Sequence, residues 1–387
     1  MSLLIVTDKF RFRKEEVSGG ISYRFVGLYS NIIAFWERRD PKALLGWYVH
    51  GEEQSLRYIK GGRVSQQKRM GIARAIIGFL VKSWRRGEHP VLLLAYPYGV
   101  PPVKKFLSWG WVFALVTLFA RLGWLTWVVD NSDPPEIVER FRAEKYPRHK
   151  SIYRYLLGYF LFPSALYLTV SQGFLRHGIQ RYKLHPQRTW LVPNGLLSSI
   201  ETPVNHTSRG SQVVYGGTIS LQMGVGELIE TFSRINQKRL VQLFLFGGQL
   251  MDVPDYPWLT CKAVPRKVYV EEGLLWADVA VIPYPRNPLT CGTLIAKIFD
   301  YMEAGLPVVM FNLGDTAALV KEAGCGLIAR DWDEFGSYVL RLLDDPALRR
   351  KLGEAGRRAV KEYRYDSIAS RFVARLHSAL KEVNVRL

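Results

Sequence analysis

Cysteine is scarce in this sequence of 387 residues, which contains only Cys261, Cys291 and Cys325. None of the three forms a Cys-x-x-Cys pair, the spacing typical of zinc sites and redox motifs. The sequence therefore predicts neither a disulfide framework nor a zinc site, and it favours a reducing compartment. The start of the chain, Met1 to Asp8, is too short and too soon charged for a signal peptide and is predicted to be a buried strand.

Long uncharged apolar runs are also absent. The most apolar stretch extends from Phe106 to Val129, and an arginine and a glycine interrupt it. Its uncharged part, Trp109 to Ala120, is only a little over half of the ~20 residues that a helix needs to span a bilayer. We therefore expect a helix over about residues 104–121 and a strand from Trp124 to Val129 rather than a transmembrane segment.

Acidic residues are few in the first half of the chain, and the charge of the protein is therefore uneven. The formal net charge is +19. Residues 1–195 hold 30 Lys and Arg against 13 Asp and Glu, whereas residues 196–387 hold 23 against 21. Such a positive surface suits nucleic acid, an anionic membrane or an acidic substrate. Because no RNA-binding module or zinc motif accompanies the charge, we expect no nucleic-acid partner.

Two segments of the first half combine apolar residues with basic or aromatic ones. Residues 65–86 form a basic amphipathic segment, which either lies on a membrane surface or packs on a sheet with a solvated basic face. Ser151 to Phe162 is predicted to be an aromatic helix, suited to a membrane–water interface and equally to a core. The sequence leaves both alternatives open.

Short apolar strands alternate with helices in both halves of the chain. This alternation is typical of parallel sheets covered by helices, and it predicts an α/β fold with two doubly wound domains. We expect a first domain at residues 1–195, a linker at 196–211 and a second domain at 212–370. Residues 371–387 are expected to form a terminal helix that packs back on the first domain.

The most informative stretch runs from Val279 to Met310. An apolar strand leads into a loop rich in Pro, Thr and Gly, and then into a helix that carries Lys297 and Asp300. Gly305 ends this helix, and Pro307 leads into the next strand. Such a strand–loop–helix unit presents backbone N–H groups and a helix N-terminus to a phosphorylated ligand.

Three motifs occur in order across the two halves. Leu191-Val-Pro-Asn-Gly195 closes the first half, Tyr215-Gly-Gly-Thr218 opens the second, and Lys297 to Val309 lies late in it. In this order and spacing they resemble the GT-B glycosyltransferases, in particular glycosyltransferase family 4 and its relatives, over about residues 165–375. The resemblance implies two Rossmann-like domains, glycosyl transfer of the hexosyltransferase type, and a nucleotide-sugar donor bound without a metal or other cofactor.

The resemblance also implies roles for residues of the second domain. Asp300 matches the acidic residue that binds the ribose hydroxyls, and a carboxylate suits that role because it accepts two hydrogen bonds from a vicinal diol. Lys297 matches a lysine that neutralises the leaving diphosphate. Gly216, Gly217 and Thr218 match the turn that approaches the diphosphate.

Two departures from the family pattern concern the donor. Gly292 stands where relatives carry a sugar-facing carboxylate. That carboxylate is therefore absent or supplied elsewhere, and the backbone N–H groups from Thr290 to Thr293 are the candidate replacement. The usual Arg and Lys pair after the first strand of the domain is missing. We therefore expect Arg266 or Lys267 to contribute to phosphate binding.

A third departure concerns the first domain, which takes the acceptor in such enzymes. No His follows the strand that ends at Val129, and Asp130 or Asp133 stands in its place as a candidate base for the acceptor hydroxyl. Asp130 serves equally well as a turn residue, and Asp133 fits an N-cap. Gly19 and Gly20 are predicted to form an acceptor loop, with an ordinary flexible connection as the alternative.

The basic, aromatic first half and the resemblance together predict a peripheral or monotopic enzyme on the cytoplasmic face of an anionic membrane. Its acceptor would be a hydroxyl of a polyprenyl- or dolichyl-phosphate-linked glycan, or of a glycolipid. One alternative is a soluble GT-B enzyme that acts on a small or free-sugar acceptor. The other is a non-catalytic nucleotide-sugar-binding protein.

Overall fold

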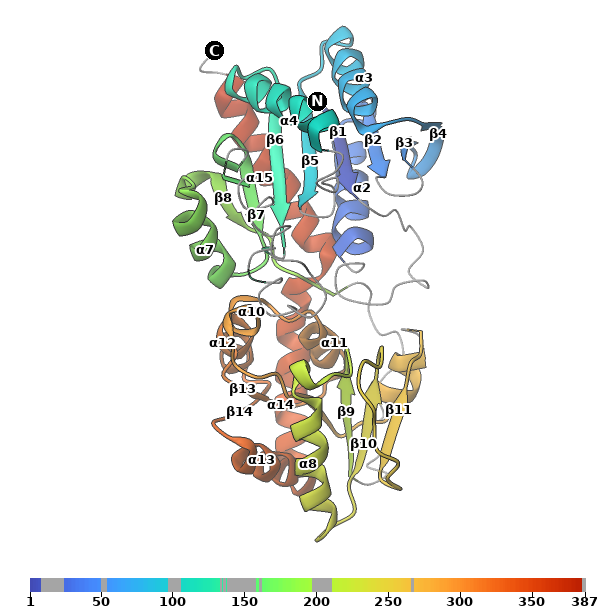
Figure 1. The fold of residues 1–387 in the computed structure, drawn as a ribbon, viewed down its shortest axis with the longest axis vertical. Helices are drawn as coiled ribbons and strands as arrows, with labels where there is room; N and C mark the ends of the chain where they lie inside the picture. The colour runs from blue at the N-terminus through green and yellow to red at the C-terminus, as the bar shows by residue number, and fades with distance from the viewer. Residues whose placement is uncertain are drawn as a thin grey trace. The chain divides into compact units, whose positions relative to one another are not determined.

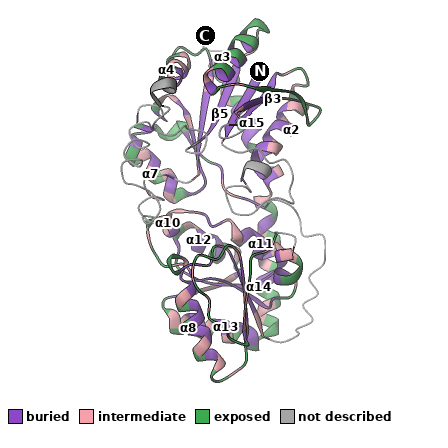
Figure 2. Ribbon diagram, turned by 45° about the vertical axis from the view of Figure 1, so that its right-hand side comes forward, coloured by how far each residue is buried: buried purple, intermediate pink, exposed green. Residues whose placement is uncertain are grey.

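The computed structural model describes residues 1–7, 24–49, 54–96, 106–132, 134, 137, 158–159, 162–196, 211–265 and 268–384. The chain divides into two compact units, and each contains its own sheet (Figure 1). The first unit draws on Met1–Phe12, Leu28–Pro193 and Ile368–Leu387, and the second on Arg13–Gly27 and Asn194–Ser367. The strands at the centre of each sheet are buried (Figure 2). This architecture confirms the predicted α/β class.

The first unit is built on an eight-stranded sheet in the order β4-β3-β2-β1-β5-β6-β7-β8. Its strands pair in parallel, except for the two antiparallel pairs β2–β3 and β3–β4. The central parallel strands β1, β5 and β6 are largely buried and mostly apolar, as expected where helices cover both faces, and the parallel strand β8 forms one edge. The strands are β1 (Ser2–Thr7), β2 (Leu45–Val49), β3 (Ser55–Lys60), β4 (Arg63–Arg69), β5 (Pro90–Tyr96), β6 (Thr126–Asn131), β7 (Leu166–Thr169) and β8 (Thr189–Leu191).

Helices of the first unit bury one apolar stripe each. In α3, Ile72, Ile76, Phe79 and Leu80 are buried, and their spacing places them on one helical face. Among the described residues, no helix is both long and apolar enough to cross a bilayer. The helical elements are η2 (Phe25–Tyr29), α2 (Ser30–Arg39), α3 (Ile72–Arg85), α4 (Phe106–Arg121), η4 (Phe162–Ser164), α7 (Gln172–Tyr182), η5 (Pro186–Arg188) and α15 (Tyr365–Asn384).

The prediction of one amphipathic segment over residues 65–86 was wrong at its start. Residues up to Arg69 belong to strand β4, and the helix α3 begins only at Ile72. Gly61 and Gly62 both have positive φ and make the tight turn that joins β3 to β4. The predicted helix over about residues 104–121 is confirmed by α4, and β6 follows it as a strand.

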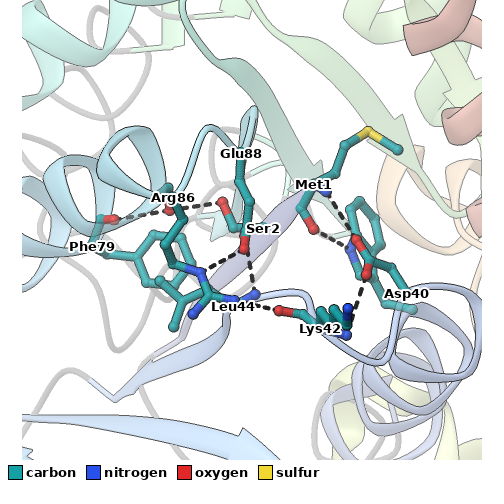
Figure 3. Close-up of polar contacts among 10 residues, drawn as sticks. Met1, Ser2, Asp40, Lys42, Leu44, Phe79, Arg86 and Glu88 are labelled. Carbon is teal, nitrogen blue, oxygen red and sulfur yellow. Dashed lines mark hydrogen bonds and ion pairs between the residues drawn. The ribbon is translucent and has the colours of Figure 1, made fainter.

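Polar contacts tie the beginning of β1 to its surroundings (Figure 3). The amino group of Met1 donates to Asp40 Oδ2 at 3.1 Å. Glu88 accepts from the Leu44 N–H at 3.1 Å and from Arg86 Nε at 2.6 Å. The carboxylate of Glu88 is therefore neutralised within the fold.

The later part of α15 packs on the first unit. The Phe372 ring lies edge-on to Trp190, and the Arg375 guanidinium lies 4.1 Å from the centroid of the same indole. Farther along the helix, the His377 ring lies 4.7 Å from that of Trp36. The helix that begins in the second unit thus ends on the first.

The second unit holds a six-stranded, all-parallel sheet in the order β11-β10-β9-β12-β13-β14. Its strands are β9 (Gln212–Gly216), β10 (Gln242–Phe246), β11 (Leu259–Lys262), β12 (Val279–Ile282), β13 (Val308–Phe311) and β14 (Gly326–Ala329). The helical elements are η6 (Leu221–Met223), α8 (Val225–Asn236), η7 (Tyr269–Leu274), α10 (Pro288–Gly292), α11 (Lys297–Ala304), α12 (Gly314–Ala323), α13 (Trp332–Asp344), α14 (Pro346–Ala359) and η8 (Val360–Tyr363).

Candidate donor site

Two glycine turns lie side by side at the carboxyl ends of β9 and β10. The Gly217 N–H donates to the Phe246 carbonyl at 2.8 Å, and the Ile219 N–H donates to the Gly248 carbonyl at 2.9 Å. Gly217 and Gly247 have φ values of +150° and +153°, which L side chains rarely adopt. A Cβ on Gly247 would lie 1.9 Å from the Gly217 carbonyl oxygen. The turn therefore requires glycine at both positions.

Lys297, the first residue of α11, places its ammonium group over this turn. A Cβ added to Gly217 would lie 2.2 Å from Lys297 Nζ. The same nitrogen lies 4.3 Å from the centroid of the Tyr215 ring and 4.5 Å from that of Tyr284, and it donates a hydrogen bond to the Tyr284 hydroxyl. The structure thus brings together Lys297 and the predicted glycine turn, which lie about 80 residues apart in the sequence.

The surroundings of Lys297 are neutral. Burial lowers the pKa of this lysine, and its contact with Tyr284 opposes that shift. Burial also raises the pKa values of Tyr215 and Tyr301, so both phenols are uncharged at neutral pH. Among the described residues, no carboxylate forms an ion pair with Lys297. A poorly solvated ammonium without a counter-charge is a site to which an anion binds favourably.

Tyr301 fixes the end of β9 from the side of α11. Its hydroxyl accepts a hydrogen bond from the Gly216 N–H at 2.9 Å. Tyr301 is buried, and it follows Asp300 on the same helix. The position of Gly216 is therefore coupled to the helix that carries Lys297.

Asp300 lies one turn after Lys297 on α11. Residues three apart on a helix are neighbours on its surface, so Asp300 and Lys297 lie on the same side of α11. The Asp300 side chain is largely buried. Gly305 ends the helix in the left-handed conformation, and Arg357 donates to the Ala304 carbonyl at 3.0 Å across it. The ribose contact of Asp300 stays a prediction.

The loop before α11 is fixed by its own hydrogen bonds. Asn287 and Thr290 form a capping box at the start of α10, and the Thr290 N–H donates to Asn287 Oδ1. The Thr293 N–H donates to the Leu289 carbonyl at 3.0 Å. Both N–H groups are thus occupied within this loop. The sugar contacts of Thr290, Gly292 and Thr293 stay predictions.

Thr316 on α12 holds the other end of this loop. Its hydroxyl accepts from the Ile295 N–H at 3.0 Å and lies 3.2 Å from the Thr293 carbonyl, to which it donates. Thr218, by contrast, is exposed, and its carbonyl accepts from the Tyr215 hydroxyl at 2.8 Å. Thr316 was not predicted from the sequence, because it lies on a different helix from the loop that it holds.

The candidate residues of the first half are described only in part. Asp130, near the carboxyl end of β6, is 1% exposed and accepts a hydrogen bond from the Tyr29 hydroxyl at 2.6 Å. Its role as the base stays a prediction. The other first-half candidates, together with two basic residues of the second half and most of the predicted linker, lie outside the described residues: Gly19, Gly20, Asp133, Arg266, Lys267 and 197–210.

Sequence reasoning also missed the two tyrosines that flank Lys297 and the third tyrosine that binds the Gly216 N–H. Tyr215 lies in β9, Tyr284 lies two residues after β12, and Tyr301 lies in α11. The first two occur at or near a strand end beside a glycine or proline, which was the available signal. Among the described residues, no three His, Cys, Asp or Glu side chains come together as a metal site.

Comparison with known proteins shows what the second unit resembles. Residues 210–345 match the family model described as glycosyl transferases group 1. Among curated proteins, the MMP α-(1→4)-mannosyltransferase of Mycolicibacterium hassiacum is 26% identical over 229 residues, which cover 56% of this chain and 54% of that protein. The match therefore spans about half of the length of this relative.

Solved structures match over nearly the whole chain. Sucrose-phosphate synthase from Thermosynechococcus elongatus has a TM-score of 0.65 at 17% identity, with 98% of this chain and 99% of that chain covered. HepE from Anabaena in complex with UDP-glucose has a TM-score of 0.58 at 13% identity, with 98% and 100% covered. At such identities the likeness concerns the fold. The chain therefore has the GT-B fold. Its second unit is similar to the group 1 glycosyltransferases over residues 210–345.

Proposed function

We propose that this protein transfers a hexosyl group from a nucleotide-sugar to a hydroxyl group of an acceptor. The observation that carries the proposal is the ammonium group of Lys297, which lies over Gly217 with no carboxylate partner among the described residues. The diphosphate of a donor would supply the missing negative charge. Lys297 would then stabilise the charge that develops on the leaving diphosphate.

The reaction has a simple balance of bonds. The acceptor oxygen forms a bond to C1 of the sugar, the bond from C1 to the diphosphate oxygen breaks, and the nucleoside diphosphate leaves. The hydroxyl proton passes to a base, for which Asp130 is the candidate at the end of β6. The Tyr29 hydroxyl donates to Asp130 and would orient this carboxylate toward the acceptor hydroxyl.

Asp300 and the comparisons support the same proposal. Asp300 lies one helical turn after Lys297, and its carboxylate would accept hydrogen bonds from the ribose of a nucleotide whose diphosphate meets that lysine. The mannosyltransferase relative is a hexosyltransferase by name, and HepE has been solved with UDP-glucose. These names favour a nucleotide-sugar donor, and they leave open which base and sugar this chain accepts.

The test compares Lys297→Ala with Lys321→Ala, a matched loss of an exposed lysine from α12. Transfer of labelled sugar is measured for a panel that includes UDP-glucose and GDP-mannose. We expect Lys297→Ala to lower kcat by roughly 100-fold, the usual loss when one preorganised charge-stabilising group is removed. The Lys321→Ala enzyme should remain close to wild type. Equal activity of the two variants would remove Lys297 from the reaction, and donor binding without turnover would favour a non-catalytic binding protein.

We further propose a lipid-linked glycan or glycolipid, presented at an anionic membrane surface, as the acceptor. The large positive excess of residues 1–195 supports this proposal, because each Lys or Arg near an anionic leaflet contributes about 1 kcal/mol to binding. The experiment offers polyprenyl-phosphate-linked glycans and free sugars to the enzyme in parallel. Preference for the free sugars would favour a soluble GT-B enzyme with a small acceptor.

A further inference from the structure

Large apolar side chains are exposed together at one end of the first unit. Trp84 at the end of α3, Leu122 after α4 and Trp124 before β6 are 36%, 51% and 55% exposed. Phe119 joins them, because its ring centroid lies 5.5 Å from that of Trp84 and 5.4 Å from that of Trp124. The helices α3 and α4 that carry these residues lie side by side (Figure 1). We call Trp84, Phe119, Leu122 and Trp124, with Arg85 and Arg121, the docking patch.

The docking patch is positively charged, and the sequence around it contains few acidic residues. Residues 54–129 contain twelve Lys and Arg and a single acid, Glu88. Glu88 is already paired with Arg86 and with the Leu44 N–H (Figure 3). Arg85 and Arg121 are exposed, and they form no ion pair among the described residues. The patch therefore offers exposed guanidinium groups beside partly exposed indole rings.

We propose that the docking patch binds the first unit to the surface of an anionic bilayer. Tryptophan side chains suit the headgroup level, leucine side chains extend toward the acyl chains, and arginines bind lipid phosphates. This inference rests on the proposed function, because a lipid-linked acceptor requires the enzyme to work at a membrane. The docking patch would be the surface of the protein that meets the lipid.

The chemistry of the patch favours a bilayer over two other partners. A second copy of the chain would bring two positive patches without acids face to face, and they would repel. A single-stranded nucleic acid would stack on the indole rings, but it would leave the exposed aliphatic side chains without a partner. Leu118 and Val81, which are also exposed on α4 and α3, enlarge that aliphatic share.

The patch lies far enough from the carboxyl edge of the sheet to be tested separately. Trp124 lies two residues before β6, whereas Asp130 lies near its end. Six residues of extended chain cover about 20 Å. The docking patch is therefore separate from the carboxyl end of β6, and it contains no residue of the second unit.

The experiment measures flotation of the full chain with phosphatidylcholine vesicles that contain phosphatidylglycerol or lack it. Two variants remove different parts of the patch, namely Trp84→Ser with Trp124→Ser and Arg85→Glu with Arg121→Glu. We expect wild type to float with the anionic vesicles at low salt. The loss of two arginines should lower the partition coefficient by about 30-fold, and the charge reversal by more. The tryptophan pair should lower it by at least about tenfold.

The matched control replaces exposed residues of the second unit, Leu240→Ser with Trp276→Ser, and should float like wild type. Thermal unfolding and nucleotide-sugar binding are measured on every variant. The arginine pair keeps the test valid if the tryptophan pair does not fold. The proposal would be overturned if wild type did not float with anionic vesicles, or if the patch variants floated like wild type. Loss of a dimer, seen by light scattering, in the tryptophan pair would also overturn it.

Donor binding separates this proposal from the proposed function. Nucleotide-sugar turnover without any vesicle binding would overturn only the docking patch. Vesicle binding that depends on the patch, without nucleotide-sugar binding or turnover, would overturn only the glycosyltransferase proposal.

Discussion

The ammonium group of Lys297 is held by aromatic groups rather than by a carboxylate. The Tyr284 hydroxyl accepts its hydrogen bond, and the Tyr215 and Tyr284 rings flank it. A neutral partner of this kind keeps the lysine oriented without cancelling its charge. The full charge is then available to a diphosphate. A salt bridge within the protein would have weakened the attraction between the ammonium group and that diphosphate.

Tyr284→Phe removes the hydroxyl and keeps the ring. Because the Tyr284 contact raises the pKa of Lys297 against the lowering effect of burial, its loss should lower that pKa further. Activity that requires the charged lysine falls as pH rises through its pKa, so the alkaline limb of the kcat profile should move to lower pH. We also expect about tenfold lower kcat at neutral pH, because hydrogen bonds to charged groups contribute about 1.5–3 kcal/mol.

Tyr256→Phe is the control, because Tyr256 is exposed on the same unit. Its pH profile should match that of wild type. If the alkaline limb of Tyr284→Phe stays in place while kcat falls, then Tyr284 acts through packing and not through Lys297.

His89 gives a pH dependence to the first unit. Burial lowers the pKa of His89, and its Nε2 lies 3.0 Å from Thr126 Oγ1. The unfolded chain therefore takes up a proton near pH 6.5 while the native chain does not, so the free energy of unfolding should fall as pH drops below that value. Urea unfolding at neutral and mildly acidic pH measures this slope. His89→Gln should flatten it, and an unchanged slope would assign the effect to other groups.

At the scale of elements, helix α11 was predictable because the sequence signals that mark it lie close together in the chain. Lys297, Asp300 and the terminal Gly305 follow one another within a single helix and its cap. Tyr215 and Tyr284 were not predictable as neighbours of Lys297, because they lie near the ends of β9 and β12 and meet this lysine only after the sheet forms. The β3–β4 hairpin was missed because every residue of β4 is exposed, so no buried face marks the strand.

The second sheet depends on an ion pair at the amino ends of its strands. Arg349 on α14 lies 3.5 Å from Asp278, and both side chains are mostly buried. Asp278 also accepts from the Gln212 N–H, and Arg349 donates to the Leu342 and Leu343 carbonyls. The pair thus links β9, the turn before β12, and α14 to the end of α13.

Arg349→Ala would leave the Asp278 carboxylate buried without its cation. We expect the free energy of unfolding of the second unit to fall by about 3 kcal/mol, as is usual when one partner of a buried ion pair is removed. Arg350→Ala, the exposed neighbour on α14, is the control and should cost less than about 0.5 kcal/mol. Denaturant unfolding measures the free energy of unfolding of both variants. Equal losses would show that the Arg349–Asp278 ion pair adds no stability of its own.

For the whole molecule, the two units have separate buried cores, and the donor is proposed to bind only the second. A ligand that binds the native state stabilises the part that holds it, by about 2.7 kcal/mol at a hundredfold excess over Kd. For a unit of this size that energy raises Tm by roughly 5–10 °C. Calorimetry with nucleotide-sugar should therefore show one transition that moves and one that does not. Lys297→Ala should reduce the shift, and a donor that moved both transitions equally would contradict binding to the second unit alone.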